Sequence, residues 1–144
     1  MIIDASVVID AVTDAGPRGQ AARQALADHP ASETLSAPGH LAVEILSGLV
    51  AAATRPCHPL QPDQIEQALL DTEALEITIE ATPWADVRRG WALAQSSLRY
   101  PDAIYVASAE RHATALLTSD ARIERSRATI RCPVITVRPS DNRS

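Results

Sequence analysis

The sequence predicts an α/β fold, with a mostly parallel central sheet of about four or five strands sandwiched by helices. Short apolar runs alternate with longer helical segments, and the connections between the runs are too long for hairpins. The chain has 144 residues, of which 46% are hydrophobic and 22% charged, as expected for one globular domain. We therefore expect a single domain over residues 1–138 and a frayed polar tail over 139–144.

The first half of the chain is expected to contain two strands and three helices. Proline is favoured in the first turn of a helix, so Pro17 begins the second helix. The pair Pro38 and Gly39 separates the second strand from a long apolar helix, which ends before Pro56. The expected elements are a strand at 1–3, helices at 6–12 and 17–28, a weak strand at 34–37 and a helix at 40–54.

The second half continues the same alternation. The expected elements are a helix from 62, a strand at 75–79, a helix from 83, a helix at 102–112, a strand at 115–117, a short helix after 120 and a strand at 134–137. Trp84 and Trp91 lie seven residues apart on one helix face, which predicts a core or dimer contact. We assign Tyr100 and Tyr105 to the core rather than to stacking on bases.

The composition excludes several kinds of chemistry. All 13 basic residues are arginine, so Schiff-base chemistry, a Walker loop and the lysine of a receiver domain are absent. The net charge of −5 argues against a broad basic face for nucleic acid. An acidic nuclease site remains compatible with this charge, because a bound cation would reverse it locally.

Cysteine usage and hydropathy indicate the cellular compartment. Cys57 and Cys132 form no CxxC pair and are expected to be free thiols in a reducing environment. Asp4 interrupts the first apolar run where an export signal would continue, and no apolar run approaches the roughly 18 residues that span a bilayer. The expectation is a cytoplasmic protein with no membrane partner.

Four carboxylates are candidate metal ligands and catalytic residues: Asp4, Glu44, Asp102 and Asp120. The carboxyl ends of parallel strands meet in one crevice, so acids near strand ends converge there. Two carboxylates about 4 Å apart repel by roughly 4 kcal/mol at an effective dielectric of about 20, which favours a shifted pKa or a bound metal.

Each acid also has a structural explanation. Asp4 and Asp120 suit helix N-caps, and Asp102 suits the first turn of a helix, where negative charge is favourable. Glu44 interrupts an apolar helix that we expect to be largely buried, so it should contact an arginine, be protonated or bind metal. The residues alone leave these alternatives open.

Motifs around these acids resemble those of the PIN-domain ribonucleases, specifically the VapC-type toxins of bacterial toxin–antitoxin pairs. The matching segments are 2–7, 38–48, 100–107 and 117–122, and their order and spacing extend over about 120 residues. The resemblance implies a PIN-like nuclease domain and an endoribonuclease that cleaves RNA with Mg²⁺, or with Mn²⁺ as a substitute. It also implies a homodimer and a small antitoxin that masks the acidic site. The chain departs from the family pattern at Pro101, directly before an acid, and at Arg122.

The hypothesis that follows assigns a role to each acid. Asp4, Asp102 and Glu44 hold the cation, which lowers the pKa of water and stabilises charge on the phosphate, and Asp120 orients the water or completes the site. The supporting residues are Ser6, Thr118 and Ser119.

Two further questions are left open by the residues. Arg99, Arg88 and Arg89 are candidate RNA contacts, although arginines on helices are more often solvated. The alternative function is a non-catalytic, metal-free binding or dimerisation module of the same fold.

Overall fold

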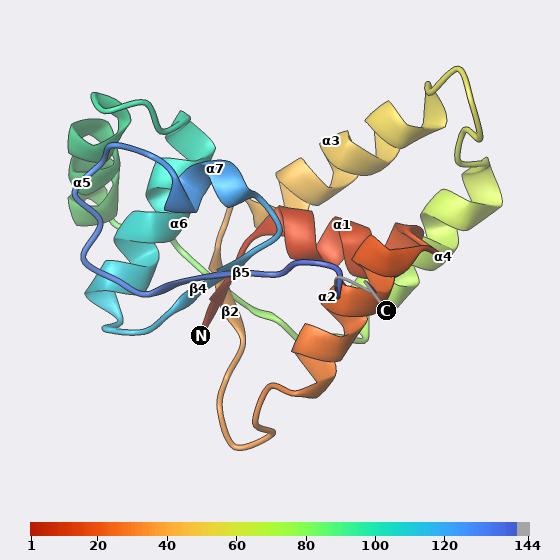
Figure 1. The fold of residues 1–144 in the computed structure, drawn as a ribbon, viewed down its shortest axis with the longest axis horizontal. Helices are drawn as coiled ribbons and strands as arrows, with labels where there is room; N and C mark the ends of the chain where they lie inside the picture. The colour runs from red at the N-terminus through yellow and green to blue at the C-terminus, as the bar shows by residue number, and fades with distance from the viewer. Residues whose placement is uncertain (141–144) are drawn as a thin grey trace.

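In a computed structural model that describes residues 1–140, five parallel strands form one sheet between helical layers (Figure 1). The strand order is β3-β2-β1-β4-β5, and every neighbouring pair is parallel. The strands are β1 (Ile2–Ile3), β2 (Ser36–Pro38), β3 (Thr78–Glu80), β4 (Leu116–Thr118) and β5 (Val134–Thr136). The predicted fold class is confirmed, and all carboxyl ends of the strands lie at one edge of the sheet.

The helices connect the strands and cover both faces of the sheet. They are α1 (Ala5–Thr13), α2 (Pro17–Ala27), α3 (Leu41–Ala53), α4 (Pro62–Glu73), α5 (Trp84–Ala94), α6 (Tyr100–Arg111) and α7 (Ala121–Glu124). Figure 1 shows α1 to α4 on one side of the sheet, and α5, α6 and α7 on the other. Within the described residues, no helix is long and apolar enough to cross a membrane.

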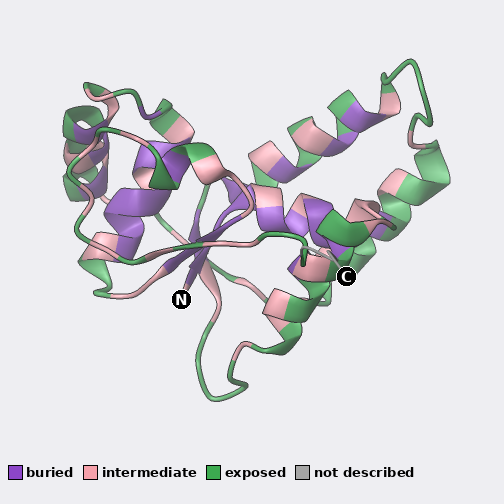
Figure 2. Ribbon diagram, in the orientation of Figure 1, coloured by how far each residue is buried: buried purple, intermediate pink, exposed green. Residues whose placement is uncertain are grey.

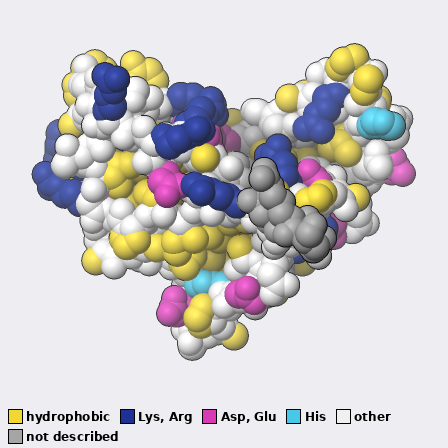
Figure 3. Space-filling view, viewed as in Figure 1, with side chains coloured by type: hydrophobic (Ala, Val, Ile, Leu, Met, Phe, Trp, Pro, Cys, Tyr) yellow, Lys and Arg dark blue, Asp and Glu magenta, His cyan; other side chains and the backbone are white. Residues whose placement is uncertain are grey.

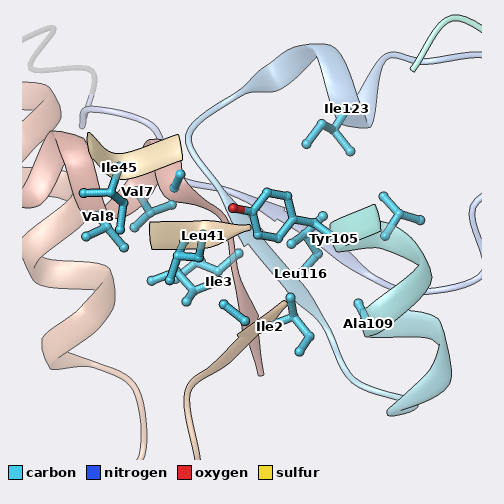
Figure 4. Packing of buried hydrophobic residues seen from close by; sticks show 14 of the residues in the cluster. Ile2, Ile3, Val7, Val8, Leu41, Ile45, Tyr105, Ala109, Leu116 and Ile123 are labelled. Atoms are coloured by element: carbon cyan, nitrogen blue, oxygen red, sulfur yellow. The ribbon is translucent and has the colours of Figure 1, made fainter. Parts of the chain in front are cut away.

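The core is centred on the middle strands, β1 and β4. Ile2, Ile3 and Leu116 are at most 1% exposed, because helices cover both of their faces (Figure 2). Val7 of α1 and Tyr105 of α6 are fully buried against these strands (Figure 4). The innermost strands therefore fix where α1 and α6 begin, and both helices begin at the edge where the acids lie.

Two element boundaries differ from the sequence prediction for identifiable reasons. The third strand is shorter than predicted, because Leu75 and Glu76 form turn hydrogen bonds to the end of α4 and Glu76 has a positive φ of 53°. Helix α6 begins at Tyr100 rather than Asp102, since Pro101 is accommodated within the first turn, where no intrahelical donor is required. Residues 141–144 of the predicted tail lie outside the described residues, and Pro139 and Ser140 are exposed.

The prediction that α3 is largely buried is wrong. Val43, Leu46 and Val50 are 68%, 49% and 51% exposed, and they lie along one side of the helix. Only the opposite side of α3, which includes Leu41 and Ile45, is buried. The continuous run of apolar residues therefore belongs to a helix with one apolar face in the core and a second apolar face exposed.

The core assignment of three aromatic residues is also wrong. Trp84 and Trp91 are 77% and 61% exposed, because α5 buries its other side, which carries Gly90 and Leu93. Tyr100 is 68% exposed at the start of α6, whereas Tyr105 is buried as predicted. A dimer contact at the tryptophans stays a prediction.

Replacement of Gly19 by alanine should destabilise the fold. A Cβ at this position would approach the backbone of α1 and its following loop, meeting Asp14 C at 2.6 Å and Asp10 O at 2.8 Å. Backbone atoms cannot move aside like a flexible side chain, so we expect a loss of roughly 1–3 kcal/mol or more in unfolding free energy. Urea unfolding of the parent and the variant measures this loss. Gly39→Ala is the control, because its Cβ would lie 3.6 Å from Glu80 O; equal losses in the two variants would contradict the prediction.

Candidate active site

The four acids predicted as ligands come from elements that meet at the carboxyl edge of the sheet. Asp4 joins β1 to α1, and Asp120 follows β4 and precedes α7. Glu44 lies in the first turn of α3, the helix after β2, and Asp102 lies in the first turn of α6. The charges of Asp102 and Glu44 both act on Asp4, so these three acids form one electrostatically coupled group.

Asp4 carries a buried carboxylate to which no arginine of residues 1–140 is bonded. Its side chain accepts a hydrogen bond from Ser6 N at 2.8 Å and one from Thr118 Oγ1 at 2.6 Å. Burial, followed by the charges of Asp102 and Glu44, raises the pKa of Asp4 to about 6 despite these hydrogen bonds. Each oxygen retains a lone pair beyond its one hydrogen bond, so the carboxylate is able to accept a cation.

The predicted supporting residues form a connected network around Asp4. Ser6 Oγ lies 3.3 Å from Thr118 Oγ1 and accepts a hydrogen bond from Ser119 N at 3.0 Å. Asp120 N donates to Thr118 Oγ1 at 3.0 Å. The start of α1 is thereby fastened to the loop after β4, which fixes the position of Asp4 relative to Asp120.

Glu44 has no arginine partner in the described part of the chain, in contrast to the salt bridge that the sequence allowed. Tyr105 Oη donates to Glu44 Oε2 at 2.6 Å, and burial with this hydrogen bond raises the pKa of Tyr105. His40 Nε2 lies 3.6 Å from the same oxygen, and the His40 ring lies 4.5 Å from the Tyr105 ring between centroids. Figure 4 shows the Tyr105 hydroxyl pointing away from α6 toward the side of Val7 and Ile45.

Sequence reasoning did not find the roles of Tyr105 and His40 beside Glu44. The available signal was spacing: Tyr105 lies three residues after Asp102 on one helix face, and His40 lies four residues before Glu44. Tyr105 was assigned to the core, where its ring does lie. Its hydroxyl nevertheless reaches the acidic group.

Arginines neutralise the remaining two acids. Arg99 binds Asp102 through Nε at 2.9 Å and Nη2 at 3.2 Å, and its Nη2 is 3.8 Å from Asp120. Arg122 Nε and Nη2 bind Asp120 at 2.6 to 3.0 Å. These contacts hold the pKa of Asp120 below its ordinary value, with the Arg122 hydrogen bond as the main cause. In Figure 3, basic and acidic side chains lie next to one another around the notch between the two helical layers.

Of the three predicted RNA-contacting arginines, only Arg99 lies among the acids. Arg89 binds Glu110 at 2.7 Å and the backbone oxygen of Thr129. Glu110 is eight residues after Asp102, roughly 12 Å along the axis of α6. Arg88 is exposed on α5. The arrangement therefore gives Arg89 a structural ion pair and leaves Arg99 as the arginine next to the acids.

Asp4 and Asp120 both act as helix N-caps, the structural role that was the alternative to metal binding. Asp4 caps α1 through Ser6 N, and Asp120 caps α7 through Arg122 N at 2.9 Å. A cap uses one lone pair of a carboxylate, which leaves acceptor capacity for a cation. Capping and metal binding are therefore compatible roles for Asp4, whereas both oxygens of Asp120 also bind the guanidinium of Arg122.

The acids fit a divalent cation by the chemistry of their donors. Within residues 1–140, no group of three or more His, Cys, Asp or Glu side chains is already placed to hold a metal ion. The coupled carboxylates of Asp4, Glu44 and Asp102 nevertheless supply hard oxygen donors. Mg²⁺ prefers such donors and keeps several waters rather than a complete protein cage. A cation would also offset the charges of Asp102 and Glu44, which add to burial in raising the pKa of Asp4.

Comparison with known proteins identifies related folds. The model of the family described as "PIN domain" matches residues 1–128. A toxin–antitoxin complex from Klebsiella pneumoniae is similar over 95% of this chain and 97% of the other, with a TM-score of 0.66 and 22% identity. The sarcin-ricin loop cleaving toxin VapC20 of Mycobacterium tuberculosis is similar over 86% and 92%, with a TM-score of 0.67 and 12% identity.

A third similar structure is VapBC2 from Rickettsia felis bound to a DNA fragment from the promoter. The similarity extends over 94% of this chain and 96% of the other, with a TM-score of 0.66 and 11% identity. No curated protein matches the chain by sequence. At these identities the similar structures establish a shared fold.

Replacement of Asp4 by asparagine should stabilise the metal-free protein at neutral pH. The folded protein disfavours the charged carboxylate, so its pKa rises from 3.8 to about 6. The ionised carboxylate therefore lowers the free energy of unfolding. This loss is absent below pH 3.8, grows between pH 3.8 and about 6, and is complete above about pH 6. The stability gain of Asp4→Asn over the parent should follow this course and reach up to roughly 3 kcal/mol, less any loss in hydrogen bonding.

Urea unfolding in a chelator at several values from pH 4 to pH 7 measures this difference. Asp10→Asn is the control, since Asp10 is buried like Asp4 but already bonded to Arg18 at 3.0 Å. That variant should show no gain at neutral pH. A pH-independent difference between Asp4→Asn and the parent would contradict the electrostatic explanation.

Proposed function

The chain belongs to the PIN domain family, as its motifs predicted, and we propose on this basis that it is a divalent-metal-dependent endoribonuclease. We further propose that it acts as the toxin of a toxin–antitoxin pair. One observation carries the proposal: Asp4 is 5% exposed, feels the charges of two further acids and has no arginine bonded to it among the residues that the structure describes. A buried carboxylate of this kind is expected to bind a cation or to hold a proton.

The residues divide the proposed work between holding the cation and orienting its ligands. Asp4, Glu44 and Asp102 supply the carboxylate oxygens. A divalent cation, when bound, lowers the pKa of water and stabilises negative charge on the phosphate. Mg²⁺ is the proposed ion, with Mn²⁺ as a substitute, because all three donors are hard oxygens.

Neighbouring hydroxyl groups fix the orientation of these carboxylates. Thr118 and the backbone of Ser6 hold Asp4, and Tyr105 holds Glu44 by a short hydrogen bond of 2.6 Å. Residues that orient ligands commonly affect metal affinity as much as some ligands do. Asp120, whose partners are arginines, is left to orient water or to complete the site.

The proposed partners are RNA, an antitoxin and a second copy of the chain. Two of the structurally similar proteins are a toxin–antitoxin complex and VapBC2, and a third is a toxin that cleaves the sarcin-ricin loop. Apolar side chains left exposed on α3 and α5 offer surface for protein contacts. The free thiols of Cys57 and Cys132 agree with a proposed cytoplasmic location.

A second candidate function is a metal-free binding or dimerisation module. It is favoured by the arginine partners of Asp102 and Asp120, which neutralise two of the four acids without any metal. Calorimetric titration with Mn²⁺ separates the two functions. Heat of binding and a rise in thermal stability support the nuclease, whereas their absence supports the binding module.

Replacement of Asp4 or Asp102 by asparagine should abolish Mg²⁺-dependent RNA cleavage and leave the fold intact. Each change removes a charged oxygen donor from the proposed site. Sequencing the 5′ ends of RNA after incubation with purified protein measures the cleavage and also reports its sequence preference. Asp63→Asn is a matched control, because Asp63 also follows a proline in the first turn of a helix but is exposed on α4. Cleavage at the parent rate by Asp102→Asn would contradict the assignment.

Replacement of Tyr105 by phenylalanine should weaken Mn²⁺ binding by about tenfold or more. The hydroxyl that orients Glu44 is lost, while the buried ring and its packing are kept. Calorimetry measures the affinity, and circular dichroism checks the fold. Tyr100→Phe serves as the control, since this tyrosine is 68% exposed. Equal affinities for the Tyr105 and Tyr100 variants would exclude an orienting role for Tyr105.

A further inference from the structure

Arg99 and Arg122 approach the acids from the solvent side. Their side chains are 59% and 65% exposed, whereas those of their partners Asp102 and Asp120 are 7% and 15% exposed. Arg99 reaches both acids, with Nη2 3.2 Å from Asp102 Oδ1 and 3.8 Å from Asp120 Oδ2. The guanidinium of Arg99 therefore lies between two carboxylates that would otherwise repel one another.

We infer that Arg99 and Arg122 act as internal cations that occupy Asp102 and Asp120 and restrict the acidic site to a single metal ion. The metal belongs at Asp4 and Glu44, with Asp102 shared between the metal and Arg99. This inference rests on the proposed function, because it concerns the number of metal ions that the same acids bind.

The hydrogen bonds show how the site is divided. Asp4 and Glu44 have neutral hydrogen-bond donors: Ser6 N and Thr118 Oγ1 bond to Asp4, and Tyr105 Oη bonds to Glu44. Neutral donors leave the negative charge of these acids in place. Asp102 and Asp120 instead have permanently charged donors, since arginine keeps its proton in proteins. A second cation, at Asp102 and Asp120, would have to displace a guanidinium that binds both carboxylate oxygens.

The geometry of arginine strengthens this competition. Arg99 and Arg122 each contact both oxygens of one carboxylate, Asp102 and Asp120 respectively, in the planar fork that suits such pairs. Arg122 is anchored further, because its own backbone N–H bonds to Asp120 Oδ1 at 2.9 Å.

Titration with Mn²⁺, followed by calorimetry and by electron paramagnetic resonance of the free ion, tests the inference. The parent chain should bind one ion, and the double variant Arg99→Gln with Arg122→Gln should bind a second. Adding Asp120→Asn to the double variant should restore binding of one ion. Arg125→Gln is the matched control, because Arg125 is an exposed arginine next to the same short helix whose guanidinium bonds only to the backbone oxygen of Ala121.

The outcomes separate this inference from the proposed function. Two ions in the parent, or one ion of unchanged affinity in the double variant, would overturn the internal-cation role and leave the nuclease intact. No binding to any variant would overturn both. Arg122→Gln alone guards against a folding defect, since Arg122 is exposed and contacts only Asp120 among the acids; it should show a second, weaker binding event that the parent lacks.

Discussion

The convergence of negative charge at one edge of the sheet is the constraint on which the site depends. Parallel strands end together, so Asp4 after β1 and Asp120 after β4 are drawn to the same place by the topology of the fold. Helices α3 and α6 add Glu44 and Asp102 from their first turns. The sheet cannot form in this order without gathering these charges, and each charge needs a compensating group.

The groups that compensate the negative charge differ among the four acids. Asp102 and Asp120 receive arginines, whose long side chains keep their heads exposed. Asp4 is as buried as Asp102, but its donors among the described residues are a hydroxyl and a backbone N–H, and burial raises its pKa to about 6. The kind of donor, rather than the depth of burial, thus separates the acids that the chain itself neutralises from an acid that is able to accept a cation or a proton.

The sequence predicted the layout of the fold better than the exposure of its helices. Alternation of strand and helix depends on local pattern, so every strand and helix was found near its predicted position. The exposure of a helix face depends on which other elements pack against it. No pattern in the sequence of α3 or α5 shows that Val43 or Trp84 is left uncovered in the described structure. The same limit hid the contact between Tyr105 and Glu44, which joins residues 61 positions apart.

The absence of lysine shapes the site as well as excluding other functions. A lysine at position 99 or 122 would place a single charged point near a carboxylate and leave the other oxygen free for a cation. Arginine instead binds both oxygens of Asp102 and of Asp120, so the two acids are held in fixed orientations. Asp4 and Glu44 are oriented by neutral donors that leave their charge in place. The site is therefore divided between neutralised and uncompensated acids, and the exposed arginines beside the neutralised pair present positive charge to a phosphate that approaches from solvent.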